Sequence, residues 1–250
     1  MLTAERHFII LQFLKEQETA TVHVLSEVTG ASVSTIRRDL LQLEEDSKLK
    51  RVHGGASLLH SKWTEPSLGE KSTQNLVQKA KIAAFAAELV KDGDCIFLDA
   101  GTTTQKIAEF LHGKEVIVVT NGYQVIESLL SEGITTYIVG GKFKARTGAM
   151  TGPKALESIE TYRFDKCFIG INGIHDVLGY TTADPDEAII KRTAIKLSRD
   201  PYILADSSKI GEAAFSKVAD LHGCTIITDD DPEANYDKVR KHTKVEVVKL

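Results

Sequence analysis

The sequence predicts an α/β protein in which an N-terminal winged helix-turn-helix is joined to a larger, mostly parallel α/β domain. Two observations predict this architecture. Apolar residues follow helical spacing up to about Asp46, whereas from about Leu76 onward β-branched apolar runs alternate with helical patterns. At 250 residues the chain is long enough for both parts. We expect the small domain at 1–60, a linker at 61–75 and the larger domain at 76–250.

Composition limits the class of protein. Hydrophobic residues make up 42% of the chain and charged residues 26%, as in globular proteins. No apolar stretch reaches the roughly 20 residues of a membrane-spanning helix, and the N-terminus lacks the order of a signal peptide. We therefore expect a cytoplasmic protein with no membrane contact. Cys95, Cys167 and Cys224 lie in or beside apolar runs without ligand spacing, so we expect buried thiols, no metal and no cofactor.

Three short helices are expected before Asp46. The first covers 3–17, the second covers 21–29 with Thr21 as its N-cap and Gly30 as its end, and Ser32 caps the third. The residues expected to face a core are Phe8, Ile9, Leu11 and Leu14 in the first helix, Val24, Leu25 and Val28 in the second, and Val33, Ile36, Leu40 and Leu43 in the third. A glycine-containing turn before the third helix is typical of the helix-turn-helix.

After Asp46 the pattern changes to the alternation typical of strands. Leu49 and Val52 precede the pair Gly54-Gly55, and further apolar residues follow it, which predicts two short strands joined at the glycines. Such a hairpin is a wing. The next stretch is polar, contains Pro66 and Gly69, and indicates a linker.

The N-terminal helices suggest a nucleic-acid surface. The net charge is −4, so overall attraction to DNA is absent, but five of the seven Lys and Arg residues in 1–60 fall between Arg37 and Arg51. A recognition helix presents hydroxyls and arginines to base edges and phosphates. The expected DNA contacts are Ser34, Thr35, Arg37, Arg38, Gln42, Lys50, Arg51 and His53. The alternative is a solvated helix whose arginines pair with Asp39, Glu44 or Glu45; the preceding turn and the basic tail favour DNA.

The larger domain contains seven strand candidates, at 95–99, 115–120, 135–140, 166–171, 202–206, 224–229 and 245–250. Helix candidates separate them, including 78–90, 187–198 and 232–242. Continuous apolar strands alternating with helices indicate a parallel sheet covered on both faces. Ligands of such sheets bind beyond the carboxyl ends of the strands.

Polar, glycine-containing segments follow several of these strands. Asp99, Gly101 and the threonines 102–104 stand where a strand meets a helix, which suits a phosphate, although an ordinary turn would look the same. Further along, Asp184 is an expected N-cap, and Glu187 and Lys191 lie one helical turn apart, either as a surface ion pair or as ligand contacts. The expected effector contacts are Asp99, Gly101, Thr102, Thr103, Thr104, Thr120, Asn121, Gly140, Gly141, Asp184, Glu187, Lys191 and Lys209.

Several motifs together resemble the DeoR family of bacterial sugar-responsive transcriptional regulators. They are VLSEVTGAS, TIRRDL and LKRVHGGA in the first domain, and DGDCIFLDAGTTT, VVTN, VGGK, FDKCFIGINGI, DEAIIKR, ADSSKIG and IITD in the second. The resemblance implies a DNA-binding repressor of a carbohydrate-utilisation operon, usually oligomeric, controlled by a phosphorylated sugar or related metabolite. Two residues depart from the pattern: Ala31 stands where valine is common, and Gly122 where serine is common.

The family's sensor domain is similar in fold to ribose-phosphate isomerases, which leaves a sugar-phosphate isomerase as the alternative function. A carboxylate would then move a proton while Lys191 stabilises an enediolate. A free-standing isomerase has no evident use for a winged helix, so we expect a regulator and no enzyme. A metal or redox sensor is disfavoured because histidines and cysteines form no cluster. We expect a homo-oligomer that places two recognition helices on an operator and that the effector controls.

Overall fold

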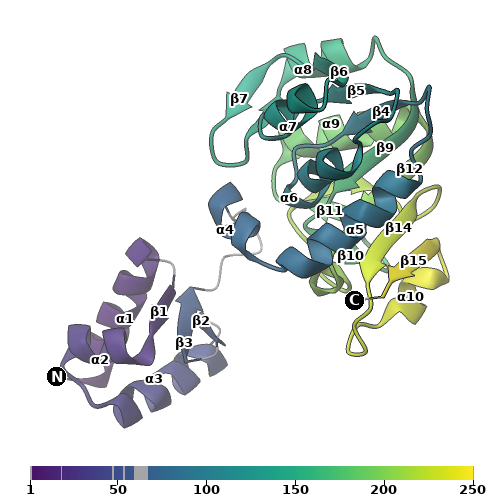
Figure 1. Ribbon diagram of the computed structural model, residues 1–250. Coiled ribbons are helices and arrows are strands. Elements are labelled where there is room, and N and C mark those ends of the chain that lie inside the picture. The colour runs from purple at the N-terminus through teal and green to yellow at the C-terminus, as the bar shows by residue number, and fades with distance from the viewer. Residues whose placement is uncertain (1, 18, 47, 53, 59–66, 250) are drawn as a thin grey trace. The chain divides into compact units, whose positions relative to one another are not determined.

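The computed structural model describes residues 2–17, 19–46, 48–52, 54–58 and 67–249 (Figure 1). The chain divides into two compact units, residues 1–61 and 62–250. The first is a winged helix-turn-helix and the second a mostly parallel α/β domain, so the predicted fold class is confirmed.

The N-terminal unit contains three helices, α1 (Thr3–Gln17), α2 (Val22–Thr29) and α3 (Val33–Glu45). Their ends follow the expected signals. Thr21 and Ser32 cap α2 and α3, because their side chains accept hydrogen bonds from the Val24 and Thr35 amides. Gly30 ends α2 in the left-handed conformation, with φ 67°.

The wing contains one strand more than the sequence predicts. β2 (Leu49–Val52) and β3 (Gly55–Leu58) form the expected hairpin, and β1 (Thr19–Thr21) pairs antiparallel with β3. A side chain at Gly55 would place its Cβ 2.1 Å from the Ala20 carbonyl oxygen. Glycine is therefore required for β3 to approach β1 so closely.

The core of this unit differs from the expectation at several positions. Ile10 and Leu14 of α1, together with Leu25 of α2, are fully buried, whereas Phe8 is 67% exposed. Four consecutive apolar residues, 8–11, fit more than one helical face, so spacing alone does not identify the packed one. The expectation was also wrong for two residues of α2, since its packed line is Val22, Leu25 and Thr29 and the exposed side chains include Val24 and Val28. In α3 the expected residues Ile36, Leu40 and Leu43 are buried and Val33 packs against them.

The C-terminal unit is built on a seven-stranded parallel sheet in the order β15-β14-β12-β9-β4-β5-β6 (Figure 1). All seven predicted strands are present. Their bounds are β4 (Cys95–Leu98), β5 (Ile117–Thr120), β6 (Thr135–Ile138), β9 (Phe164–Gly170), β12 (Ser198–Leu204), β14 (Thr225–Asp229) and β15 (Lys244–Val248).

Helices cover both faces of this sheet. Successive side chains of β4 point to opposite faces, and each side packs in a different apolar cluster. Ile96 and Leu98 of β4 belong to one apolar cluster and Phe97 to another. The first cluster includes residues of α5 (Leu76–Glu88), α7 (Val125–Ser131) and the 3₁₀ helix Lys106–Phe110 that follows α6 (Thr102–Gln105). The second includes residues of α8 (Pro153–Ile159), α9 (Pro185–Lys196) and α10 (Tyr236–Arg240).

Smaller elements complete this unit. An antiparallel sheet contains β10 (Gly173–His175), β11 (Gly179–Thr182) and β13 (Ser216–Ala219), and a hairpin contains β7 (Lys142–Lys144) and β8 (Ala149–Thr151). Within the range expected to be a linker, residues Leu68–Thr73 form the helix α4. No helix in the described part of the chain is long and apolar enough to span a bilayer.

Candidate functional site

The surface of α3 opposite the core is polar and basic. Ser34, Arg37, Arg38 and Gln42 are exposed and Thr35 is half-buried. Leu41, 44% exposed, lies among them and was missed by the sequence analysis, because an apolar residue in an amphipathic helix is normally assigned to the core. The exposed apolar side chain adds a group able to contact a thymine methyl.

Two of the three carboxylates that could neutralise the α3 arginines are engaged elsewhere. Asp39 is buried and accepts hydrogen bonds from Arg6 of α1, at 2.5 Å from Nε and 2.9 Å from Nη2. Glu44 pairs with Arg51 of the wing at 2.6 Å. Neither Arg37 nor Arg38 forms an ion pair with any residue that the structure describes. The alternative of a self-neutralised helix surface is therefore unsupported.

The wing residues predicted to contact DNA are less well placed. The Arg51 amide donates to Glu44 Oε1 at 2.8 Å, and its side chain donates to the same carboxylate, so Glu44 ties the wing to α3. Lys50 lies in β2, but its side chain and all of His53 fall outside the described residues.

A cavity lies in the C-terminal unit at the carboxyl ends of β4, β9 and β12. Seven of the thirteen predicted effector residues line it, namely Asp99, Gly101, Thr102, Thr103, Glu187, Lys191 and Lys209. Ten lining residues are outside the list of expected effector contacts. Six of them are Lys71, Gln74, Lys79, Ala100, Leu204 and Ala205, and the other four, Gly170, Ile171, Asn172 and Asp206, lie in segments that follow predicted strands. The cavity is thus lined by four lysines, three carboxylates and two threonines.

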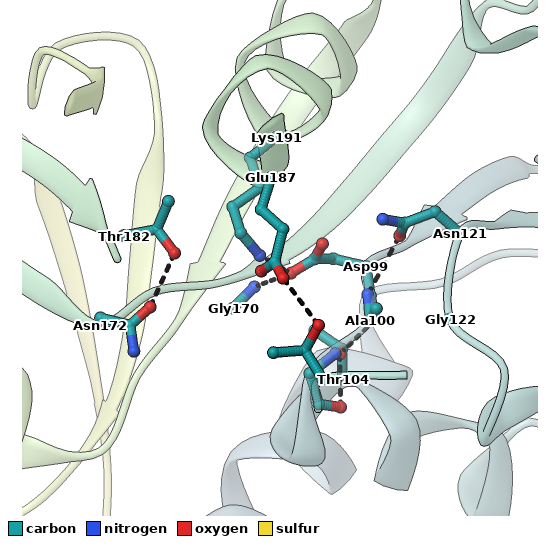
Figure 2. A network of polar contacts seen from close by, with 12 residues as sticks. Asp99, Ala100, Thr104, Asn121, Gly122, Gly170, Asn172, Thr182, Glu187 and Lys191 are labelled. Atoms are coloured by element: carbon teal, nitrogen blue, oxygen red, sulfur yellow. Dashed lines mark hydrogen bonds and ion pairs between the residues drawn. The ribbon is translucent and has the colours of Figure 1, made fainter. Parts of the chain in front are cut away.

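Two oppositely charged side chains lie at the base of the cavity. Lys191 projects from α9 toward the end of β4, where its Nζ lies 2.5 Å from Asp99 Oδ2 (Figure 2). The same oxygen accepts the Gly170 amide at 3.0 Å. Both side chains are buried, with relative exposures of 6% and 1%. The surface pair considered for Lys191 and Glu187 is therefore wrong, because α9 turns this face inward.

Glu187 lies one turn before Lys191 and is also buried. Its Oε1 accepts hydrogen bonds from Lys144 Nζ at 2.8 Å and from the Thr147 hydroxyl at 2.7 Å. Burial alone would raise the pKa of this carboxyl, but the positive charges of Lys191 and Lys144 hold it below its usual range. Glu187 is therefore an ionised hydrogen-bond acceptor in the cavity wall, suited to hydroxyl groups.

The threonines after β4 have different roles. Thr102 and Thr103 line the cavity at the first turn of α6, where backbone amides have no intrahelical partners. The Thr104 hydroxyl is used within the turn, since it donates to the Asp99 carbonyl at 2.6 Å and accepts the Gly101 amide at 3.0 Å. Thr104 therefore shapes the loop and does not line the cavity.

Five further predicted residues lie outside the cavity wall. Thr120 donates to the Leu98 carbonyl at 2.7 Å, and Asn121 Oδ1 accepts the Ala100 amide at 3.1 Å (Figure 2), so both support the loop after β4 from behind. Asp184 caps α9 and pairs with Lys144 at 2.7 Å. Gly140 and Gly141 follow β6 and are not among the lining residues.

Gly122 has a packing role and is not among the residues that line the cavity. A Cβ at this position would lie 2.9 Å from the Ala100 Cα. Serine would therefore force this loop away from Ala100, whose neighbours Asp99 and Gly101 line the cavity. Glycine at this position therefore allows the two loops to approach each other closely.

The lysines that the prediction missed come from α4 and α5. Lys71 and Gln74 fall in the polar stretch taken for a linker, where no sequence signal distinguishes them. Lys79 offered a signal, because it shares a helical face with the buried Ile82, Ala83 and Ala86. Burial lowers the pKa of Lys79, Asp206 opposes this shift, and the positive charges of Lys209 and Lys71 add to it. A bound anion would stabilise the charged form.

Comparisons with known proteins cover almost the whole chain. Residues 6–62 match the DeoR-like helix-turn-helix domain, and residues 74–230 match the DeoR C terminal sensor domain. The chain is 48% identical over 250 residues to a Bacillus subtilis (strain 168) protein named uncharacterized HTH-type transcriptional regulator FruR, with 100% of both chains covered. It is 32% identical to the lactose phosphotransferase system repressor of Staphylococcus epidermidis, over 94% of this chain and 96% of that one.

Among solved structures, ribose 5-phosphate isomerase A of Methanocaldococcus jannaschii overlaps with 54% of this chain and 55% of its own, at a TM-score of 0.41 and 18% identity.

Proposed function

The chain belongs to the DeoR family of transcriptional regulators, and from this we propose that it represses a carbohydrate-utilisation operon under the control of a sugar phosphate bound in the C-terminal cavity. It is a DNA-binding regulator and not an enzyme, since its homologues are named as regulators and repressors. The isomerase alternative has no support beyond the shared sheet architecture, which does not determine function.

The residues of the cavity wall support a sugar phosphate as the class of ligand. Lys71, Lys79 and Lys209 line one cavity together with the first turn of α6. Ammonium groups and unpaired helix amides bind phosphate oxygens. Glu187 and Asn172 supply acceptors for sugar hydroxyls. A phosphate ester of a polyol offers both kinds of group a partner, whereas a neutral sugar offers the ammonium groups no anionic oxygen.

On the DNA side, we propose that α3 reads an operator with Ser34, Arg37, Arg38 and Gln42, supported by wing residues. The exposed arginines without ion pairs in the described chain support this assignment. A homo-oligomer would place two such helices in successive major grooves of an inverted repeat. A regulator that binds the chromosome would act in the cytoplasm.

Two measurements on the full-length protein test this proposal. First, selection from random duplexes yields the operator. Second, melting temperatures are measured with a panel of hexose and pentose phosphates, each beside its parent sugar. We expect one phosphate, and not its sugar, to raise the melting temperature, because a ligand that binds the folded state stabilises it by mass action. The same compound should change affinity for the selected duplex.

A matched pair of variants locates the site. Lys209→Met should abolish most of the stabilisation by phosphate, whereas Lys241→Met, an exposed lysine after α10, should leave it intact. Absence of any shift across the panel would overturn the sugar-phosphate assignment. An equal response of the two variants would place the ligand elsewhere.

A further inference from the structure

Helix α4 is the first helix or strand among the described residues of the C-terminal unit, and it comes after the segment of the chain that leads from the winged helix. Its N-terminus is closed by a capping box in which the Ser67 hydroxyl accepts the Glu70 amide and the Glu70 carboxylate accepts the Ser67 amide. A six-residue helix is not stable alone in water. Its position therefore depends on its contacts with the rest of the unit.

One set of contacts is shared with the cavity. Lys71 and the residue that ends the helix, Gln74, both line the cavity. The Lys71 carbonyl also accepts a hydrogen bond from Lys79 Nζ, which lines the same cavity. An anion in the cavity would compete with that carbonyl for the Lys79 ammonium.

A second contact reaches the cavity through the turn 144–148. The Leu68 amide donates to the Arg146 carbonyl at 2.9 Å. The turn is tight, because the amides of Thr147 and Gly148 both donate to the Lys144 carbonyl. The side chains of Lys144 and Thr147 in turn donate to Glu187, which lines the cavity. The Glu187 carboxylate thus lines the cavity and also binds two side chains of the turn that holds α4.

We propose that α4 is the output element of the sensor. Occupation of the cavity by an anionic ligand changes the bonds of Lys79 and Glu187, and these two residues change how α4 is held at both of its ends. The altered α4 changes the placement of the winged helix and hence operator affinity. A ligand shifts such an equilibrium only by contacts that differ between the two states, and Lys79 and Glu187 supply them. This inference rests on the proposed function, since it assigns the regulation of that same cavity.

The α4 anchor is tested with a substitution that removes one backbone N–H. Leu68 occupies the first helical position after the N-cap Ser67, where proline is favourable, and Ser67 already has the extended conformation, with ψ 160°, that proline requires before it. Leu68→Pro therefore keeps the helix and removes the N–H that binds Arg146. Leu68→Ala also removes the leucine side chain but retains the N–H, so it is the matched control. Thr147→Val is an independent test, with the exposed Thr161→Val as its control.

The measured quantity is the ratio of affinities for the selected duplex with and without ligand, the probes being inorganic phosphate and every sugar phosphate of the panel. In the wild type, L68A and T161V we expect a change of at least about fivefold with the effective probe. In L68P and T147V we expect a ratio near one, although the probe still raises the melting temperature.

The outcomes separate the two proposals. If L68P and T147V respond as strongly as their controls, α4 is not the output element and the proposed function stands. If no probe changes either the melting temperature or duplex affinity of the wild type, both proposals are overturned.

Discussion

In the N-terminal unit the cations of α3 are exposed and lack ion pairs within the described chain, whereas in the C-terminal unit Lys191 and Lys79 are buried beside the cavity. The difference follows from the two ligands. DNA is a large polyanion that meets an exposed surface, so its contacts stay hydrated until binding. A small metabolite must be enclosed by its binding site. The buried charges that recognise it are therefore paired with protein groups before the metabolite binds.

The comparison predicts that the largest loss of stability comes from the buried pair. Lys191→Met leaves the Asp99 carboxylate buried without its cation and should lower the free energy of unfolding by about 3–5 kcal/mol. The matched control, Lys196→Met at an exposed position of the same helix, should change it by less than about 0.5 kcal/mol. Denaturant unfolding of the full chain measures both. Adding Asp99→Asn to K191M should restore part of the loss, and equal stability of K191M and K196M would contradict the comparison.

A smaller loss is expected for the buried carboxylate of the N-terminal unit. Burial alone would raise the pKa of Asp39, but hydrogen bonds from Arg6 and His7 hold it below its usual range. Its stabilising contribution is therefore present above the unfolded pKa of about 3.9 and is lost as pH falls through the lower folded value. Asp39→Asn should lower the free energy of unfolding by about 1–3 kcal/mol at pH 7. Calorimetry should also show a smaller decrease in stability between pH 4 and pH 2 than in the wild type. The exposed Asp46→Asn should retain the acid slope of the wild type.

For the exposed arginines the effect should appear in DNA affinity and not in stability. Arg38→Ala should weaken binding of the selected duplex by about 1–3 kcal/mol if Arg38 contacts a base, or reduce the salt slope by about one if it contacts a phosphate. Titrations at several salt concentrations distinguish these results. Arg240→Ala, which removes the same charge from α10, is the control. Unchanged affinity in R38A would remove this residue from the recognition surface.

The smallest effect is expected at the exposed pair between Glu44 and Arg51. Glu44→Gln should reduce stability by about 0.2–1 kcal/mol, because water screens this interaction. Glu45→Gln, next to it and exposed, should reduce it less. Thermal unfolding at low and high salt measures the difference, which should shrink as salt rises. If Glu44→Gln lost as much stability as K191M, and by the same amount at low and high salt, the exposed pair would be no weaker than the buried pair and the comparison would be contradicted.

Much of the fold follows from local sequence signals. The seven parallel strands are continuous apolar runs, and the caps Thr21, Ser32 and Asp184 each precede a helical pattern. Strand β1 could not be predicted, because three residues carry no periodicity and its pairing depends on the distant Gly55. The packed face of α1 was ambiguous for a different reason, because four consecutive apolar residues, 8–11, fit more than one helical face.

The candidate site was predictable where it follows a strand end and unpredictable where it depends on tertiary packing. Asp99, Gly101, Thr102 and Thr103 belong to the segment after β4, and the structure places them at the cavity. Asn121 also follows a strand, yet its side chain supports the loop after β4 and does not line the cavity. Side chains at the strand ends of one sheet edge therefore do not all point to one place. Lys71 reaches the cavity through α4, whose position depends on the bond between the Leu68 amide and the Arg146 carbonyl, 78 positions further along the chain (146 − 68 = 78).

The order of strands in the large sheet also determines when each part of the chain can fold. Strand β4 pairs with the central strand β9, whose partner residues lie 70 positions later in the chain, as in Ile96 and Lys166 (166 − 96 = 70). Non-local parallel pairing of this kind is slow, since a long loop must close before contacts form. During synthesis the winged helix emerges first and its contacts are local, so it can fold while the ribosome is still making the sheet. A nascent repressor therefore has a DNA-binding module before it has a means of being switched.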